Sequence, residues 1–462
     1  MKPGNPRKLF GTDGIRGEAG KFPLDSRTVR IIGSSLAKHL AERIDGRPPH
    51  IVIGRDTRES GVWIEEDLIT GARSEGAQVE SAGIITTPGV AFLARTLPAD
   101  AGVVISASHN PYQDNGIKVF EPSGRKLDEK TERRIEKDIA GALPEPASAT
   151  NGFTQSHSIE RSPTDLRRLY LDYLGNEVAR DLSLKNLTIV VDCANGAACE
   201  IAPPLFERLG ARVVAINNQP DGRNINHECG SLHIEGLQPH VLSKRADLGV
   251  AFDGDADRAL FVDSSGKFVD GDATLWALAT YMKSRSELAG DNVIATVMSN
   301  IGLEIALRSR EIRLTRTDVG DKYVLDELIR SGAALGGEQS GHIIFPKLSL
   351  AGDGMITTIG LLRAMRDQKS TLHDLTEGFK GYPQVLVNVR VREKSPFAEF
   401  PAIQELVDRI EKELGDRGRL LLRYSGTEPL ARVMIEGESQ SQIEAQANAL
   451  AEAIRSELGA DD

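Results

Sequence analysis

The chain has 462 residues, of which 40% are hydrophobic and 27% charged. This length is well beyond the size of a single hydrophobic core, so roughly two to four domains are expected. Its 56 basic and 67 acidic residues give a net charge of -11, which repels polyanions and argues against nucleic acids and anionic membranes as partners. A phosphate site would therefore need a local cluster of arginine and lysine.

The three cysteines and the N-terminal segment narrow the cellular setting. Cys193, Cys199 and Cys229 are odd in number and lack CxxC spacing, so neither a disulfide framework nor a zinc site is indicated, and buried free thiols are expected. Residues Met1 to Gly17 lack the apolar stretch of a signal peptide, and no apolar run is long enough to span a membrane. A soluble cytoplasmic protein is predicted.

Short apolar runs alternate with helical patterns along most of the chain. Ser26 to Ile44 and Glu132 to Ala142 have the period of amphipathic helices. The runs that read as buried strands, each followed by a polar loop with glycine, are Ile51 to Gly54, Val103 to Ser106, Thr188 to Asp192, Leu248 to Phe252 and Val293 to Val297. This alternation predicts α/β units with mostly parallel sheets.

The last part of the chain follows a different order. Proline and small residues predict boundaries within Leu143 to Thr164 and within Gly378 to Pro383. After the second boundary, the predicted elements are strands at Val385 to Val391, Arg419 to Tyr424 and Arg432 to Glu436, and helices at Phe400 to Leu414 and Ser441 to Leu458. This order indicates a smaller α+β domain.

Ligands of α/β sheets bind beyond the carboxyl ends of the strands, so the loops after the apolar runs are the candidate sites. The first loop is Ile105-Ser-Ala-Ser-His-Asn-Pro111. Ser108 there can lie on a tight turn with its hydroxyl exposed, as a nucleophile or phosphoryl carrier requires. The alternative is a serine that only bonds to local backbone. No GxSxG surrounds Ser108, so acyl transfer is not supported.

The second loop is Phe252-Asp-Gly-Asp-Ala-Asp-Arg258. The carboxylates of Asp253, Asp255 and Asp257 can converge on one hard cation, and oxygen ligands of this kind suit magnesium. The spacing begins like a calcium EF-hand, but Arg258 and Ser264 stand where that loop needs glycine and glutamate. A solvated turn is the alternative.

Two further loops offer groups for a sugar phosphate. In Gly336 to His342, the side chains of Glu338, Ser340 and His342 suit sugar hydroxyls, although a polar turn between strands has the same composition. The loop from Arg423 to Pro429 could form a phosphate cradle, or it could be a surface turn with a solvated arginine. The cradle residues are Arg423, Ser425, Gly426 and Thr427, with Arg432 nearby.

Other basic residues lie in glycine-containing loops near the N-terminus. Arg16 lies in Phe10 to Gly17, and Arg55 and Arg58 follow the first predicted strand. Each could help to hold phosphate or to order the Ser108 loop, or could be a structural ion-pair partner. No P-loop GxxxxGK[ST] and no GxGxxG after a strand is present, so the common nucleotide-binding motifs are excluded.

Taken together and in this order, these segments resemble the α-D-phosphohexomutase superfamily across essentially the whole chain. Within it they are most similar to the phosphoglucosamine mutase family, through Phe10 to Gly17, Ser106 to Asn110 with Lys118, Arg316 to Val324, Gly336 to His342 and Arg423 to Gly437. The resemblance implies three related α/β domains and a smaller α+β domain around a central cleft. Their expected ranges are 1–150, 151–255, 256–375 and 376–462.

The resemblance also implies an activity and roles for the residues. It implies interconversion of glucosamine 6-phosphate and glucosamine 1-phosphate for UDP-N-acetylglucosamine synthesis. Ser108 would be phosphorylated, and Mg²⁺ would bridge its phosphate to the three aspartates, with Arg258 sharing the charge. A hexosamine or glucose 1,6-bisphosphate would be the intermediate and activator. Arg16 would assist catalysis.

Lys118 and His109 are the expected proton-transfer groups. Lys118 is the candidate general acid or base, and nearby cations would have to lower its pKa for it to act as a base. His109 would orient Ser108 or share the proton transfer. Glu338, Ser340 and His342 would contact the sugar.

Two departures from the family pattern and several alternatives stay open. Ala256 stands where glycine is frequent, and Ala351 stands where threonine is often found. The first keeps all three carboxylates, and the second leaves the sugar preference less defined. A phosphomannomutase or phosphoglucomutase is the alternative within the class, and a metal-dependent phosphatase or a non-catalytic sugar-phosphate sensor lies outside it. A homodimer is the family-based expectation.

Overall fold

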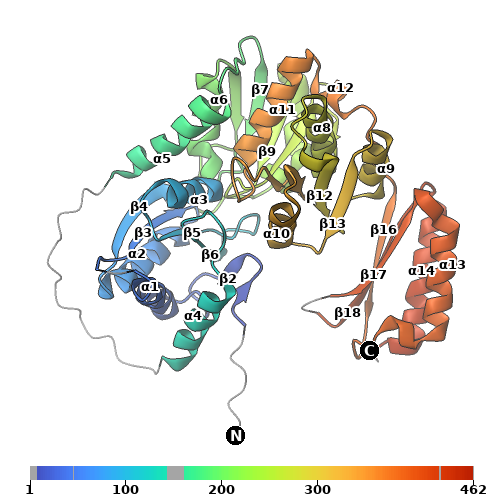
Figure 1. Cartoon of the computed structure of the whole chain (residues 1–462), viewed down its shortest axis with the longest axis horizontal. Coiled ribbons are helices and arrows are strands. Elements are labelled where there is room, and N and C mark those ends of the chain that lie inside the picture. Colours follow the sequence, from blue (N-terminus) through green and yellow to red (C-terminus); the bar gives the residue numbers. More distant parts are fainter. Residues whose placement is uncertain (1–7, 45, 143–160, 426–427, 461–462) are drawn as a thin grey trace, which may run out of the picture. The chain divides into compact units, whose positions relative to one another are not determined.

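The computed structural model describes residues 8–44, 46–142, 161–425 and 428–460. Two compact units form, Met1–Val297 with Thr315–Glu377, and Met298–Leu314 with Gly378–Asp462. Figure 1 colours the chain along its sequence and labels most of the elements named below. The expected domain boundaries stay predictions.

The N-terminal part of the first unit contains a six-stranded sheet of order β1-β2-β6-β5-β3-β4. Its strands are β1 (Phe10–Gly11), β2 (Gly14–Glu18), β3 (His50–Arg55), β4 (Gln78–Ile84), β5 (Ala101–Ile105) and β6 (Asp114–Phe120). Its helices are α1 (Ser26–Ala41), α2 (Ser60–Ser74), α3 (Thr87–Thr96) and α4 (Glu129–Gly141). β3 is parallel to β4 and β5, whereas β6 pairs antiparallel with β5 and β2.

Both faces of this sheet are covered, which explains its uninterrupted apolar runs. Ile51 and Ile53 of β3 belong to a core that contains residues of α1, α2 and α4. Val52, between them, belongs to a second core with Val90 of α3. Successive side chains of a strand point to opposite faces, so a strand buried on both sides is apolar at every position.

A second mixed sheet, of order β11-β10-β9-β7-β8, follows in the same unit. Its strands are β7 (Thr188–Asp192), β8 (Arg212–Ile216), β9 (Leu248–Phe252), β10 (Ala259–Asp263) and β11 (Phe268–Val269). The associated helices are α5 (Pro163–Asp172), α6 (Ala202–Arg208) and α7 (Leu237–Lys244). β7 is parallel to β8 and β9, and β9 pairs antiparallel with β10, so one tight loop joins β9 to β10.

The third sheet has the order β13-β12-β14-β15. Its strands are β12 (Asn292–Thr296), β13 (Arg313–Thr317), β14 (Leu335–Gly337) and β15 (Ile343–Ile344), and the nearby helices are α8 (Gly271–Ser284), α10 (Asp321–Ser331), α11 (Gly354–Gln368) and α12 (Leu372–Thr376). β12 is parallel to β14, whereas β14 turns antiparallel into β15.

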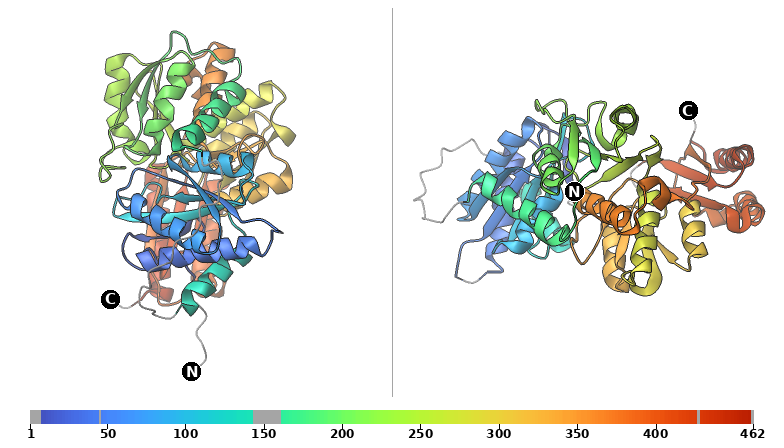
Figure 2. Two further views of the ribbon diagram at one scale, coloured as in Figure 1. Left: turned by 90° about the vertical axis from the view of Figure 1, so that its left-hand side faces the viewer. Right: turned by 90° about the horizontal axis from the view of Figure 1, so that it is seen from above.

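The second unit combines an antiparallel sheet with helices. Its elements are α9 (Ile301–Ser309), β16 (Gln384–Arg390), α13 (Pro401–Leu414), β17 (Arg419–Tyr424), β18 (Leu430–Glu436) and α14 (Gln440–Leu458). The strand order is β16-β18-β17, and α13 and α14 lie side by side in Figures 1 and 2. Val433 and Ile435 of β18 share a core with Leu450 and Ile454 of α14.

The predicted fold class is confirmed: three α/β parts with mixed sheets precede a smaller α+β part. The expected parallel pairing holds at the centre of the α/β sheets, whereas their edge strands are antiparallel. Cys193 and Cys229 are buried free thiols, but Cys199 is partly exposed, which corrects that expectation. None of the helices within the described residues has the length and apolarity needed to cross a membrane.

The packing of α1 on α2 generates a test of this fold. A Cβ atom added at Gly71 of α2 would overlap the backbone carbonyl of Arg30 in α1, and one at Gly33 would overlap that of Leu68. Alanine favours a helix over glycine by about 1 kcal/mol, but overpacking costs about 1–3 kcal/mol. We expect Gly71→Ala to lower the free energy of unfolding, measured by urea denaturation.

Gly141, in the last turn of α4, is the matched control because a Cβ atom there meets no heavy atom within 4 Å. Gly141→Ala should leave the stability unchanged or raise it by up to about 1 kcal/mol. Equal stabilisation by both substitutions would contradict the close approach of α1 to α2.

Candidate active site

The loop after β5 holds Ser108 in a constrained conformation. Ser108 has a φ of 55°, a left-handed value that a non-glycine residue adopts only at some energetic cost. The Ser106 hydroxyl accepts a hydrogen bond of 2.9 Å from the Ser108 amide. Ser108 Oγ donates to Asp253 Oδ2 at 2.6 Å and lies 3.4 Å from His109 Nδ1. The predicted tight turn is present.

The side chain of Ser108 is buried, with 1% of the residue exposed, which corrects the expectation of an exposed hydroxyl. The reason is the β9–β10 loop, which brings Asp253 against the serine. Because its buried hydroxyl bonds to a carboxylate of another loop, Ser108 does not fit the alternative of a serine that bonds only to local backbone. It joins the first candidate loop to the second.

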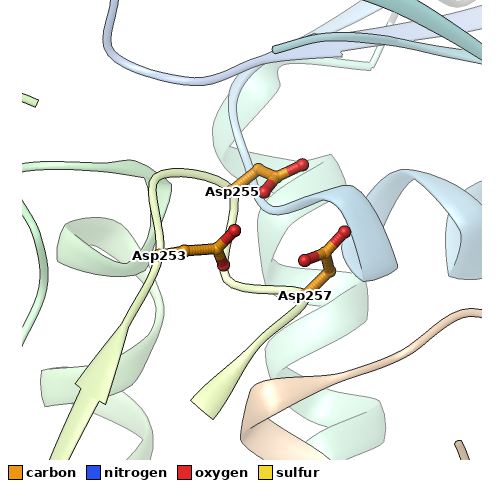
Figure 3. A group of neighbouring side chains, drawn as sticks. All are labelled: Asp253, Asp255 and Asp257. Atoms are coloured by element: carbon orange, nitrogen blue, oxygen red, sulfur yellow. The ribbon is translucent and has the colours of Figure 1, made fainter. Parts of the chain in front are cut away.

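The three aspartates of the second loop converge, as Figure 3 shows. One oxygen from each of Asp253, Asp255 and Asp257 lies within 4.8 Å of the others, and all three residues are buried. Two unit charges about 5 Å apart repel by about 3 kcal/mol at an effective dielectric constant of about 20. The solvated-turn alternative does not fit these buried side chains.

Unmet hydrogen-bonding capacity in this loop fits a hard cation. Asp255 Oδ1 and Asp257 Oδ1 are buried without a hydrogen-bond partner. Burial and the negative charges of Asp257 and Asp255 raise the pKa of Asp253 well above its ordinary value. A divalent ion held by oxygen ligands would relieve both the repulsion and the unpaired oxygens, so the donor set suits Mg²⁺.

Lys118 of β6 already supplies one positive charge to the triad. Its Nζ atom lies 2.8 Å from Asp255 Oδ2 and 3.4 Å from Asp257 Oδ2, and 1% of the residue is exposed. Burial alone would lower the pKa of Lys118, but the carboxylates of Asp13, Asp255 and Asp257 outweigh it and raise the pKa. The lowered pKa that a base role would require is therefore not present.

The pKa of Asp257 shifts in the opposite direction from that of Asp253. Burial would raise it, but the charges of Lys118 and His342 lower the pKa of this carboxyl below its ordinary value. The triad thus combines one carboxyl that resists ionisation with one that is held ionised.

His109 and Arg258 complete the surroundings of Ser108. Burial, followed by the positive charges of Arg258 and Arg16, lowers the pKa of His109 to about 4, so its imidazole is neutral at pH 7. The Arg258 amide donates to Asp253 Oδ1 at 3.2 Å, and Arg258 Nε is buried without a hydrogen-bond partner. The Arg258 side chain is partly exposed, and a guanidinium group with an unused donor suits an anionic ligand.

The other arginines near the N-terminus divide between site and scaffold. Arg16 forms an ion pair with Asp13, whose carboxylate also lies 3.4 Å from Lys118 Nζ. Arg55 bonds Glu65 at 2.9 Å, and buried Arg58 pairs with Asp56. The ion pair supports a structural role for Arg55, whereas Arg58 also donates to the carbonyl oxygens of Ser108 and Asn110, as expected of a residue that orders the Ser108 loop.

The Gly336 to His342 loop joins β14 to β15. Glu338 and Ser340 are partly exposed, and Ser340 Oγ has no hydrogen-bond partner. His342 is buried, and its Nδ1 lies 3.6 Å from Asp257 Oδ1. Burial alone would lower its pKa, but the carboxylates of Asp257 and Asp321 raise the pKa of His342 to about 9. This loop therefore contributes a cation to the aspartate loop.

The candidate phosphate cradle lies on the second unit. Arg423 of β17 stands directly opposite Arg432 of β18, an arrangement of like charges that an anion would relieve. Arg432 bonds Glu428 at 3.1 Å, and its buried Nε has no hydrogen-bond partner among the residues that the structure describes. Gly426 and Thr427 lie outside the described residues.

Several contributing residues carried no recognisable signal in the sequence. Lys394 Nζ bonds the carbonyl oxygen of Ser425 at 2.6 Å, which adds a third cation beside the cradle. Thr87, at the start of α3, donates to Asp255 Oδ2 at 2.5 Å. Asp13 lies within the motif Phe10 to Gly17, but only its contact with Lys118 shows that it belongs to the surroundings of the aspartate triad. The roles of all predicted site residues stay predictions.

Four sequence models of the phosphoglucomutase/phosphomannomutase family match the chain in succession. They are alpha/beta/alpha domain I at residues 7–144, alpha/beta/alpha domain II at 168–266, alpha/beta/alpha domain III at 270–382 and the C-terminal domain at 386–453. The four matches lie in chain order and together cover most of the sequence.

Similar curated proteins extend over almost the whole chain. The phosphoglucosamine mutase of Solibacter usitatus (strain Ellin6076) is 51% identical over 98% of this chain and 99% of its own length. That of Koribacter versatilis (strain Ellin345) is 46% identical over 98% of both chains. These matches leave no large region of either sequence unaligned.

Solved structures share the fold. A phosphoglucomutase/phosphomannomutase family protein from Burkholderia thailandensis has a TM-score of 0.78, with 25% identity and 97% of each chain covered. An Aspergillus fumigatus N-acetylphosphoglucosamine mutase, solved with GlcNAc-6P and magnesium, has a TM-score of 0.65 and 18% identity over 99% of this chain and 97% of its own. From the matched domains and the full-length relatives, the chain belongs to the phosphoglucomutase/phosphomannomutase family.

Proposed function

We propose that the protein interconverts glucosamine 6-phosphate and glucosamine 1-phosphate through a phosphoserine at Ser108 and a 1,6-bisphosphate. The 1-phosphate would serve UDP-N-acetylglucosamine synthesis. The proposal is carried by the contact of Ser108 Oγ with Asp253 inside a buried carboxylate triad. The identity of the sugar is inferred from the two relatives, both phosphoglucosamine mutases, which align with this chain over almost their whole length.

The proposed reaction is an isomerisation made of two phosphoryl transfers. In the first, the bond from Ser108 Oγ to phosphorus breaks, and a free hydroxyl of the sugar monophosphate bonds to that phosphorus. The sugar hydroxyl loses a proton, and the serine oxygen gains one. After the bisphosphate has reoriented, its other phosphoryl group is transferred to Ser108. This second transfer regenerates the phosphoserine and releases the isomer.

The protonation states around Ser108 suggest how the protons move. His109 is neutral and lies 3.4 Å from Ser108 Oγ, so it can orient this oxygen or accept a proton. Lys118 is the proposed general acid or base; its raised pKa keeps it protonated, which disfavours the base role and also makes it a weak proton donor. Arg258 and Arg16 would stabilise the charge that develops on the transferred group.

Asp253, Asp255 and Asp257 fit Mg²⁺ and would hold it together with the phosphate of Ser108. The bound ion would supply neutralisation of the negative charge on the phosphoryl group. A hexosamine or glucose 1,6-bisphosphate is the proposed activator, because enzyme that loses its phosphoryl group needs a donor.

The remaining predicted residues complete the proposal. Glu338 and Ser340 would contact the sugar in both orientations. His342 was also expected to contact the sugar, but it is buried 3.6 Å from Asp257, so it would contribute its positive charge to the aspartate loop. Arg423, Ser425, Gly426, Thr427 and Arg432 would hold the phosphate that is not reacting. A cytoplasmic location and a homodimer belong to the proposal by analogy with the family.

The substrate is tested with glucosamine, glucose and mannose 6-phosphates, each incubated with protein, Mg²⁺ and a trace of hexose 1,6-bisphosphate. We expect the 1-phosphate of glucosamine to form fastest, as followed by phosphorus NMR. Faster conversion of another sugar would identify a phosphoglucomutase or phosphomannomutase instead. Release of inorganic phosphate would indicate a phosphatase, and binding without conversion a sensor.

Removal of the Ser108 hydroxyl tests the phosphoserine. Ser108→Ala should keep the fold and lose mutase activity by more than about 1,000-fold, because binding and electrostatics alone remain. Ser34→Ala is the control, since Ser34 lies partly exposed on α1 and its hydroxyl donates to Glu75. Normal turnover by Ser108→Ala in the presence of bisphosphate would rule out this mechanism.

The carboxylate triad predicts a metal-dependent stability. In wild type, Mg²⁺ at about 100 times its Kd should add about 2.7 kcal/mol to the free energy of unfolding. Asp253→Asn should lose this gain without loss of metal-free stability, since the raised pKa of Asp253 means that ionising its carboxyl above pH 4 opposes folding. Thermal unfolding at pH 7 with EDTA or Mg²⁺ measures both effects.

Asp408→Asn is the matched control for this experiment, because Asp408 lies exposed on α13. It should keep the full stabilisation by Mg²⁺. An equal response of Asp253→Asn and wild type to Mg²⁺ would place the metal elsewhere.

A further inference from the structure

The carbonyl groups on either side of His109 are held by two side chains. Asn226 Nδ2 donates to the carbonyl oxygen of Ser108 at 2.9 Å and to that of Asn110 at 3.1 Å. The guanidinium group of Arg58 donates to the same two oxygens, at 3.2 Å and 2.5 Å. Each carbonyl oxygen has two lone pairs, and each therefore has both of them occupied.

The chemistry of this contact fixes the orientation of the Asn226 amide. Both partners are carbonyl oxygens, so only the NH₂ end can face them. Its two hydrogens match the two acceptors, and 9% of the residue is exposed. The backbone amide of Asn226 donates to the carbonyl of Ala194 at 2.9 Å, and φ is 57°, a left-handed value that asparagine tolerates better than most residues.

The two donors come from different parts of the chain. Arg58 follows β3 in the same α/β part as Ser108, and its partner Asp56 accepts from the Ser106 hydroxyl at 2.6 Å. Asn226 lies between β8 and α7, in the α/β part that carries the aspartate loop. Arg58 thus bonds the serine loop within the same α/β part, whereas Asn226 connects that loop to the α/β part that carries the aspartates.

This contact lies directly against the aspartate loop. A Cβ atom at Gly254 would come within 2.6 Å of the Ser108 carbonyl oxygen and 2.9 Å of Asn226 Nδ2. Gly254 separates Asp253 from Asp255, so the serine loop, the Asn226 amide and the metal loop meet at one point. A small rotation of the peptide planes around His109 would move Ser108 Oγ relative to Asp253.

From these contacts we infer that Asn226 is a positioning residue for phosphoryl transfer: it holds the phosphoserine loop in register with the aspartate loop while the sugar intermediate reorients. The inference rests on the proposed mutase function. Other contacts join the same two parts, including the bond of 2.5 Å from Thr57 Oγ1 to the carbonyl of Asn195. Loss of the Asn226 amide should therefore displace the serine loop and leave the fold intact.

The test uses Asn226→Asp and Asn226→Gly in the full-length protein. Aspartate keeps the size and the left-handed tolerance but places a carboxylate against two carbonyl oxygens, and glycine keeps the backbone freedom without any donor. A misplacement of about 1 Å at a reacting group can cost about 100-fold in rate. We expect kcat to fall about 10- to 100-fold in both variants, with KM for glucosamine 6-phosphate within about threefold of wild type.

Asn186→Asp is the matched control, because Asn186 is also left-handed, with φ of 72°, but lies exposed between α5 and β7. It should keep wild-type kcat. Unchanged kcat in Asn226→Asp would overturn the inference. So would a loss that follows only the unfolded fraction in a thermal melt, because a merely structural role gives that result.

Hydrogen exchange separates this inference from the proposed function. If wild type converts none of the three sugars, the mutase proposal fails, and exchange at the amides of residues 106–110 decides the positioning role alone. Faster exchange there in Asn226→Asp than in Asn186→Asp supports the inference, whereas equal exchange overturns it.

Discussion

Three carboxylates and a serine hydroxyl share one buried space, and their mutual repulsion has to be compensated by positive charge. Lys118 and His342 approach this group from β6 and from the β14–β15 loop, and Arg258 lies in the aspartate loop itself, with Nε 4.0 Å from Asp257 Oδ1. Their charges hold Asp257 ionised, yet the pKa of Asp253 stays raised, so the compensation is incomplete. The negative charge that remains favours a bound metal ion. It also explains why polar side chains of the neighbouring loops point toward the three carboxylates.

The backbone that carries Ser108 and the three carboxylates contains strained positions. Ser108 and Ala256 both adopt left-handed conformations, with φ of 55°, and each belongs to a loop that presents an oxygen ligand. Glycine at position 256 would adopt this conformation without strain, so alanine there carries a cost of about 1–2 kcal/mol. Strained positions persist where surrounding contacts determine the backbone, and the contacts of Arg58 and Asn226 with the serine loop are of that kind.

Strong local patterns made the strands and helices predictable, because strands buried on both faces are apolar throughout. The aspartate triad was also visible, since its residues alternate within one loop. The surroundings were not, because burial and charge depend on contacts between distant segments. Lys118 illustrates the limit: its motif indicated a catalytic lysine, but only the approach of Asp13 and Asp255 shows that its pKa is raised. Asn226 has no motif of its own and matters through two backbone carbonyls.

Opposed like charges also occur on the second unit, where Arg423 faces Arg432 across the β17–β18 pair. Like charges placed opposite each other in a sheet are destabilising unless an ion of opposite sign lies between them. Arg432 bonds Glu428 at 3.1 Å, so part of this positive charge is compensated within the second unit. The aspartate loop of the first unit follows the same rule, because Lys118 and His342 lie beside its carboxylates. In each unit, charges of one sign cluster and side chains of opposite sign from the same unit lie against them.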